Sequence, residues 1–224
     1  MSVVSGSFRA RVRSSIEAPV ARFFGRLGFS PNGLTVIGFG IGLVAAYFAA
    51  VQSWLIAGLI VAFGAIFDLF DGALARATSR TSRFGAFLDS TLDRASEAAV
   101  YIAIAYAFIV TDELIGAALA MAAMTSAFMV SYTRAKAESL GFSAGNGMQN
   151  VGLAPREVRT LILVIGLLGA PIAESGTGFG DGSPLFPIIA LGLITLLASI
   201  TAIQRILFVY KQSTSEPNIE KENV

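Results

Sequence analysis

The sequence predicts an all-α integral membrane protein with six transmembrane helices, preceded by an amphipathic helix on the membrane surface. Of its 224 residues, 54% are hydrophobic and 14% are charged, and the mean hydropathy is +0.71. Soluble domains carry about 25% charged residues, so a chain this poor in charge is expected in a bilayer. Cysteine and histidine are both absent, which excludes disulfides, thiolate zinc sites and histidine-based acid–base chemistry.

Six apolar stretches each approach or exceed the roughly 20 residues that a transmembrane helix needs. They run over 34–51, 54–77, 84–110, 114–134, 155–173 and 184–208. No repeat at a fixed period is visible, so we expect one membrane domain over 31–211.

The basic residues lie on one side of these stretches. The expected outer connections, 52–53, 111–113 and 174–183, contain none of the 16 lysines and arginines. The positive-inside rule therefore places both termini and all the basic connections in the cytoplasm. We expect a multi-pass protein of the cell membrane, with the lipid bilayer as a partner and no nucleic acid.

Residues 1–30 carry apolar side chains at helical spacing, with arginines largely elsewhere on the helical wheel. This pattern predicts an amphipathic helix on the inner leaflet. No uninterrupted apolar core of a signal peptide is present in this segment. At the other end, residues 212–224 are polar and charged, and we expect a disordered cytoplasmic tail.

The second and third stretches contain four aspartates near their cytoplasmic ends. Asp68 and Asp71 share one helical face, and Asp89 and Asp93 share another. The short turn between the two helices makes them antiparallel neighbours, so the two pairs can face each other. A carboxylate in apolar surroundings costs several kcal/mol unless it is paired or binds a metal.

Four converging carboxylates suit one or two hard divalent cations, Mg²⁺ or Mn²⁺, which prefer oxygen ligands. An alternative is that the acids only pair with nearby arginines, and charge balance allows this. Pairing alone does not explain why Gly72 and Gly85 share the faces of the aspartates. We therefore favour a two-metal site that clamps a phosphate.

The pattern D-x-x-D-G-x-x-A-R-x8-G-x3-D-x3-D, which runs from Asp68 to Asp93, resembles the signature of the CDP-alcohol phosphotransferases, and every fixed position is filled. The resemblance implies transfer of a phosphatidyl group from CDP-diacylglycerol to an alcohol, with release of CMP. It implies two Mg²⁺ ions, or Mn²⁺, held by Asp68, Asp71, Asp89 and Asp93, with Asp93 also acting as general base. It also implies a homodimer.

The same resemblance implies the residues that contact the CDP moiety. These are Gly72, Arg76, Ser82 and the entry to the first span, Pro31, Asn32, Gly33, Leu34 and Thr35.

Cationic residues at the inner ends of the last three spans predict an acceptor that carries its own phosphate. The candidates are Arg134, Lys136, Arg156, Arg159 and Arg205. The alternative is that they are anchors reaching lipid headgroups. Their sequence context resembles the phosphatidylinositol phosphate synthases of actinobacteria, which implies inositol 3-phosphate as acceptor, although Arg134 and Lys136 are swapped relative to the usual order.

Three other functions remain open. Phosphatidylglycerophosphate synthases usually read D-P-x-A-D-K over the last two aspartates, whereas this chain reads Asp89-Ser-Thr-Leu-Asp93-Arg. A divalent-cation transporter could use the same carboxylates, but no inverted repeat is visible. A silent scaffold with a structural metal is the third alternative.

Overall fold

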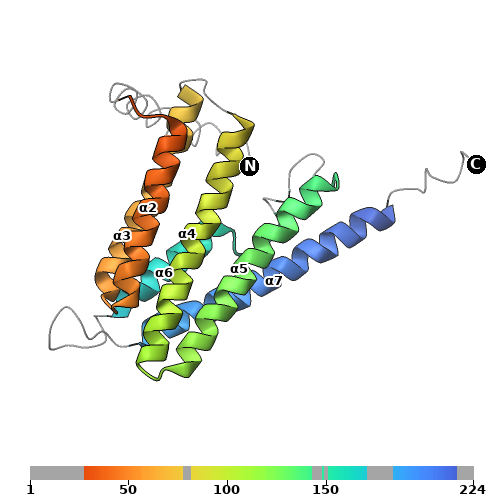
Figure 1. The fold of residues 1–224 in the computed structure, drawn as a ribbon. Helices are drawn as coiled ribbons and strands as arrows, with labels where there is room; N and C mark the ends of the chain where they lie inside the picture. The colour runs from red at the N-terminus through yellow and green to blue at the C-terminus, as the bar shows by residue number, and fades with distance from the viewer. Residues whose placement is uncertain (1–27, 78–81, 143–147, 149–150, 171–183, 216–224) are drawn as a thin grey trace, which may run out of the picture.

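The computed structural model describes residues 28–77, 82–142, 148, 151–170 and 184–215, and they form a bundle of six helices (Figure 1). The helices are α2 (Pro31–Ala50), α3 (Trp54–Ala77), α4 (Arg83–Val110), α5 (Leu114–Ser139), α6 (Arg156–Gly169) and α7 (Leu185–Ser215). The expected amphipathic helix over 1–30 lies almost wholly outside the described residues.

Two of the helices at the basic end begin with the same serine cap. The Ser30 hydroxyl accepts the Gly33 N–H at the start of α2, and the Ser82 hydroxyl accepts the Gly85 N–H at the start of α4. Pro31 occupies the first turn of α2, where its missing N–H costs no hydrogen bond. These caps fix where both helices begin.

Close packing joins the helices into a ring in the order α2, α4, α5, α7, α6, α3 and back to α2. Figure 1 shows α2, α4 and α5 in front, with α3, α6 and α7 behind them. The helices alternate in direction, so the start of α2, α4 and α6 lies at the same end as the finish of α3, α5 and α7. Among the described helices, α4 and α6 face each other across the ring and do not pack closely along their length.

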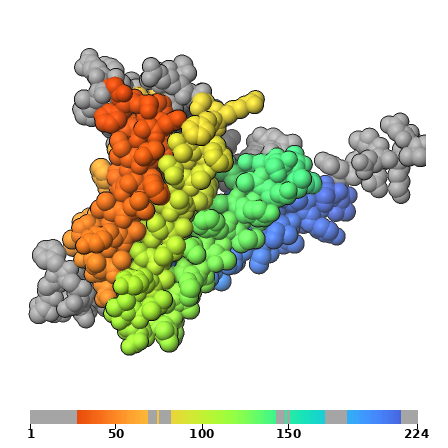
Figure 2. Space-filling model, in the orientation of Figure 1, coloured from red at the N-terminus to blue at the C-terminus, as the bar shows by residue number. Residues whose placement is uncertain are grey.

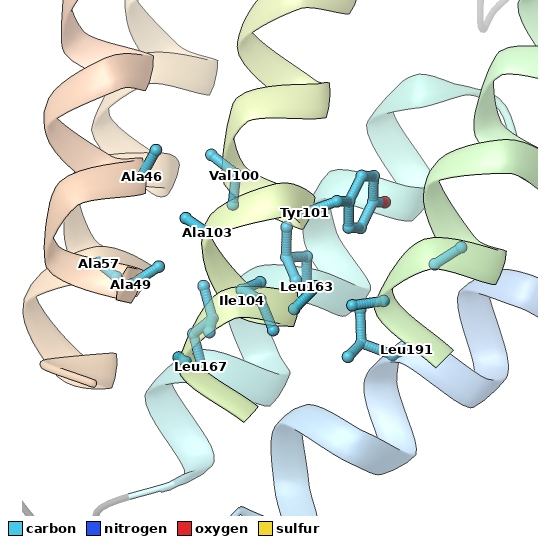
Figure 3. Close-up of a cluster of buried hydrophobic side chains, with 14 of the residues drawn as sticks. Ala46, Ala49, Ala57, Val100, Tyr101, Ala103, Ile104, Leu163, Leu167 and Leu191 are labelled. Atoms are coloured by element: carbon cyan, nitrogen blue, oxygen red, sulfur yellow. The ribbon is translucent and has the colours of Figure 1, made fainter. Parts of the chain in front are cut away.

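Towards the end opposite the starts of α2, α4 and α6, small side chains allow the helices to pack closely. Figure 3 shows Ala46 and Ala49 of α2 facing α4. Tyr101 projects from α4 on the side away from α2. The packed residues form one apolar cluster that joins all six helices.

The outer faces of the helices expose large apolar side chains. Examples from α2, α3, α4, α6 and α7 are Val44, Phe63, Ile102, Ile165 and Leu196. Figure 2 shows the front helices α2, α4 and α5 forming a continuous outer surface. An exposed apolar surface on a helical bundle is expected where lipid covers it.

Within the described part of the chain, three helices are long and apolar enough to cross a membrane: Pro31–Ala50, Leu114–Ser139 and the stretch Leu185–Thr214 of α7. Over its described side chains, helix α3 has a shorter apolar stretch, Trp54–Asp68. Helix α6 has 14 residues, which rise about 21 Å, less than the roughly 30 Å of hydrocarbon. The structure therefore supports a helical membrane protein with three clear candidate spans.

Two helices extend well past their expected ends, whereas the helix starts differ from the expected ones by at most three residues. Helix α5 continues to Ser139 and α7 continues to Ser215, beyond the expected ends at 134 and 208. Both extensions are polar, so hydropathy alone could not place them. Residues 212–215 of the expected disordered tail are consequently helical.

Candidate functional site

Two of the four signature aspartates meet at a single arginine. Arg156, the first residue of α6, donates from Nη2 to Asp68 Oδ2 and from Nη1 to Asp93 Oδ2, each at 2.7 Å. The acids come from α3 and α4, so one guanidinium joins three helices. The side chains of all three residues are partly exposed, at 34% for Arg156, 27% for Asp68 and 17% for Asp93. The cluster is therefore accessible from outside the bundle.

Of the other two aspartates, only Asp89 has a described side chain. Asp89 lies one turn before Asp93 on α4 and is half-buried. Asp71, Gly72 and Arg76 belong to α3, but their side chains lie outside the described part of the chain. Among the side chains that are described, no group of three or more acids lies close enough together to hold a metal ion.

Glycines of α2 leave room for polar groups of the neighbouring helices. A Cβ at Gly38 would stand 3.3 Å from Asp68 Oδ1, and one at Gly42 would stand 1.8 Å from Ser96 Oγ. Gly40 has open space around it. Two glycines of this G-x-G-x-G run thus serve packing inside the bundle, next to the acidic cluster.

The expected CDP-binding residues at the starts of α2 and α4 lie close together. A Cβ at Gly85 would stand 3.0 Å from both Asn32 Oδ1 and Ser82 Oγ. The absence of a side chain at Gly85 lets the first turns of the two helices approach. Thr35 Oγ1 donates to Pro31 O at 3.2 Å, and Leu34 is buried below this turn.

Arg159, one turn after Arg156, is buried at 1% exposure. Its Nε and Nη2 donate to the two carboxylate oxygens of Glu97, at 3.1 and 3.0 Å, and its Nη1 donates to Ala154 O at 3.0 Å. Its guanidinium also contacts the side chain of Tyr101. Three protein groups therefore surround a cation that the sequence predicted at the acceptor phosphate.

Arg205 of α7 is also buried, at 3% exposure, and it donates to the carbonyls of Val151 and Val130. Beside it, Thr201 Oγ1 accepts from the backbone N–H groups of Leu153 and Ala154, at 3.0 and 2.9 Å. These contacts attach the segment 151–154, which leads into α6, to α7.

The remaining predicted acceptor contacts lie near the end of α5. Arg134 pairs with Glu138 at 2.9 Å, with side-chain exposures of 35% and 38%. Lys136 is exposed on the same helix. Both cations are open to a ligand.

A cavity of about 690 Å³ opens beside the acidic cluster. Asp68, Asp93 and Arg156 lie in its wall, and the rest of the lining is mainly apolar. The lining comes from α2, α3, α4 and α6, and includes Phe39, Ile60, Ile66, Leu92, Leu161 and Val164. The cavity thus offers charged groups and an apolar surface to the same ligand.

Sequence reasoning did not identify Glu97, Ser96 or Thr201. A signal for Glu97 was present, because it continues the four-residue spacing of Gly85, Asp89 and Asp93. No local pattern marks Ser96 or Thr201, whose partners lie on other helices.

Comparison with known proteins identifies a family and its relatives. The model of the CDP-alcohol phosphatidyltransferase family matches residues 29–210. An archaetidylinositol phosphate synthase of Pyrococcus horikoshii is 36% identical over 202 residues, covering 88% of this chain and 94% of its own. A phosphatidylinositol phosphate synthase of Cutibacterium acnes is 34% identical over 204 residues, covering 90% and 96%.

Solved structures are also similar. The phosphatidylinositol phosphate synthase of Mycobacterium tuberculosis with CDP-DAG bound superposes with a TM-score of 0.75 at 27% identity, covering 94% of this chain and 100% of that one. A complex of the same enzyme with manganese and citrate gives a TM-score of 0.73 at 27% identity, covering 87% and 88%.

These matches span nearly the whole chain and include the acidic signature. They favour an enzyme over the transporter and scaffold hypotheses. The chain belongs to the CDP-alcohol phosphatidyltransferase family.

Proposed function

We propose that this protein transfers the phosphatidyl group of CDP-diacylglycerol to a hydroxyl of inositol 3-phosphate, giving phosphatidylinositol phosphate and CMP. The observation that carries the proposal is the convergence of Asp68, Asp93 and Arg156 at the wall of a largely apolar cavity. An amphiphilic donor needs charged groups for its pyrophosphate and an apolar surface for its chains.

The names of the relatives agree on the inositol phosphate part of the product but differ in the lipid part. Both curated relatives are named for an inositol phosphate product, whereas one is an archaetidyl and the other a phosphatidyl enzyme. Inositol phosphate is the part the two names share. The cationic residues at the basic end predict an acceptor that carries its own phosphate, and an inositol phosphate meets that requirement.

The carboxylate oxygens of the signature aspartates are suitable ligands for divalent ions. Asp68 and Asp93 direct oxygens from two helices at one positive group, the Arg156 guanidinium, and a metal would need the same convergence of oxygen ligands. Asp68, Asp71, Asp89 and Asp93 would hold two ions, Mg²⁺ or Mn²⁺. When bound, such ions offset the negative charge of the pyrophosphate.

The chain's own residues then carry the proton and orient the substrates. Asp93 accepts the proton of the acceptor hydroxyl as that oxygen bonds to the β-phosphorus. The bond between the β-phosphorus and the oxygen that bridges it to CMP breaks, and CMP leaves with that oxygen. Gly72, Arg76, Ser82 and the first turn of α2 (Pro31, Asn32, Gly33, Leu34, Thr35) bind the CDP moiety.

Arg156, Arg134 and Lys136 are the cations best placed for the acceptor phosphate, since each has an accessible side chain. Arg159 and Arg205 share the predicted role, but protein groups surround both guanidinium groups.

In the cell we propose a six-span protein of the plasma membrane with its site on the cytoplasmic side, working as a homodimer. The end that carries the acidic cluster also carries the described lysines and arginines, whereas the 111–113 turn at the other end carries Asp112 and Glu113. This asymmetry supports the orientation.

The test is CMP release from CDP-diacylglycerol by the purified protein with Mg²⁺ and four acceptors. These are inositol 3-phosphate, free inositol, glycerol 3-phosphate and serine. Turnover with inositol 3-phosphate that Asp93→Asn abolishes supports the proposal. Preference for glycerol 3-phosphate would make the protein a phosphatidylglycerophosphate synthase, and no turnover with any acceptor would remove the proposed function.

A further inference from the structure

We infer that Glu97 and Arg159 form a positioning pair that sets the separation of α4 and α6, and thereby places Arg156 against Asp68 and Asp93. The inference deepens the proposed function and rests on it for its kinetic consequences. It gives Arg159 a role different from binding the acceptor phosphate, and it assigns a role to Glu97.

The two helices are joined by two ion pairs one helical turn apart. Asp93 and Glu97 are separated by four residues on α4, and Arg156 and Arg159 by three residues on α6. Both spacings place the side chains on one helical face. We call Asp93–Arg156 the outer pair and Glu97–Arg159 the inner pair.

The two pairs differ in their access to solvent. Side-chain exposure is 34% for Arg156 and 17% for Asp93 in the outer pair, but 2% for Arg159 and 12% for Glu97 in the inner pair. The outer pair is therefore open to exchange its partners for substrate. The inner pair is enclosed, and a bidentate arginine–carboxylate contact has a fixed geometry.

The inner pair lies where close packing of the two helices is lacking. Helix α6 packs on α3 and α7, and α4 packs on α2 and α5. The cavity is lined by α4 and α6 together with α2 and α3, and its lining includes Glu97 and Tyr101 of α4 and Thr160 and Leu163 of α6. The separation of the helices at this end therefore depends on the length of the inner pair.

Each of the three guanidinium nitrogens of Arg159 already donates a hydrogen bond within the protein. Two nitrogens donate to Glu97 and the third to Ala154 O, and the guanidinium is buried. A phosphate could reach it only by displacing these groups from a buried site.

The segment before α6 is fixed from the opposite side. Thr201 accepts from Leu153 and Ala154, and Arg205 donates to Val151 O. Ala154 is thus held by Thr201 through its N–H and by Arg159 through its carbonyl. Arg156 follows two residues later, so its position is determined by α7 on one side and by the inner pair on the other.

The test is a double-mutant cycle with Glu97→Gln, Arg159→Gln and the double variant. We would measure the acceptor KM, kcat, and the dissociation constant of Mn²⁺ by electron paramagnetic resonance without substrates. Glu97 lies one turn from Asp93, a proposed metal ligand on the same helix, and loss of a residue that orients metal ligands typically costs about 10–100-fold in metal affinity or activity. We expect each single variant to weaken Mn²⁺ binding and raise the acceptor KM by about tenfold, and the double variant to do no more than either single one.

Two results would overturn the inference. If Arg159→Gln raises the acceptor KM while Glu97→Gln leaves both constants unchanged, Arg159 is a phosphate ligand. If the variants lower only the melting temperature and leave Mn²⁺ affinity and KM unchanged, the pair is merely structural. If the wild type shows no turnover with any acceptor, the proposed function fails, but the Mn²⁺ measurement still tests the pair.

Two further variants make the test robust. Glu97→Asp keeps the charge and shortens the side chain by one methylene, so it serves if Glu97→Gln does not fold. We expect weaker Mn²⁺ binding with it, whereas wild-type affinity would contradict a role in spacing. Glu113→Gln makes the same chemical change at the start of α5, where the glutamate side chain makes no capping hydrogen bond, and should behave as wild type.

Discussion

Gly38 of α2 lies directly against the carboxylate of Asp68 on α3: a Cβ at Gly38 would stand 3.3 Å from Asp68 Oδ1. That distance is tight but not prohibitive, so an added methyl group displaces the carboxylate by a few tenths of an ångström. The glycine therefore helps determine where a signature acid can lie.

Gly38→Ala should consequently impair the site more than the fold. We expect a melting temperature close to that of the wild type, with weaker Mn²⁺ binding and lower kcat, because the displaced group is a carboxylate at the cavity wall. Manganese titration and thermal unfolding in the same detergent would check this. An unchanged Mn²⁺ affinity would show that Asp68 tolerates the methyl group.

Gly42→Ala should act on stability instead. Its Cβ would stand 1.8 Å from Ser96 Oγ and 2.9 Å from Ser96 Cβ, so α2 and α4 must separate. Overpacking of this kind costs about 1–3 kcal/mol.

Gly40→Ala is the matched control on the same helix, since nothing lies within 4 Å of its Cβ. It should be neutral or slightly stabilising, because alanine favours helix over glycine. Thermal unfolding of both variants, with Ser96→Gly added to Gly42→Ala, tests the contact. The added substitution should recover part of the loss.

Thr201→Val should destabilise the segment before α6. The valine keeps the shape but leaves the N–H groups of Leu153 and Ala154 without their acceptor. A buried donor without a partner costs about 1–3 kcal/mol. Thr201→Ser keeps the hydroxyl and should lie much closer to the wild type in thermal unfolding.

Gly152→Ala should be more damaging at the same contact. Gly152 has φ of +122°, and a Cβ there would stand 2.2 Å from Thr201 Cγ2. Backbone strain and steric overlap with Thr201 would then both lower the stability of the variant. Because Thr201→Ser removes the methyl group but not the strain, it should rescue Gly152→Ala only in part.

Arg156→Gln should make stability depend on divalent ions. Without the guanidinium, Asp68 and Asp93 lose the positive charge that holds them together. We expect a lower melting temperature than the wild type in EDTA and a larger gain when Mg²⁺ is added. Equal gains in the two proteins would show that Arg156 and the metal do not share these carboxylates.

The sequence predicted helix boundaries well where an apolar stretch meets a short polar turn. Helix α3 begins at Trp54 as expected, and Arg83–Val110 begins one residue earlier than expected and ends where expected. Hydropathy did not predict the ends of α5 and α7, because their last turns are polar and extend past the apolar stretch.

The part of the site that depends on local spacing along a helix was predictable from the sequence. Spacing along α3 and α4 identified the acids, since neighbouring turns of one helix are local. It gave Arg156 and Arg159 the same role, because both begin the same helix. Their environments differ through tertiary contacts, with Glu97 and Tyr101 on α4 enclosing only Arg159.

The attachment of segment 151–154 to α7 also bears on how mutational data for this enzyme should be interpreted. Thr201 touches no reacting group in the proposed chemistry, yet it supports the residue that precedes Pro155 and Arg156. A screen scored by growth or product yield would therefore rank damage at Thr201 beside damage at the acidic cluster. Only paired measurement of abundance and turnover would separate a lost support from a lost reactant.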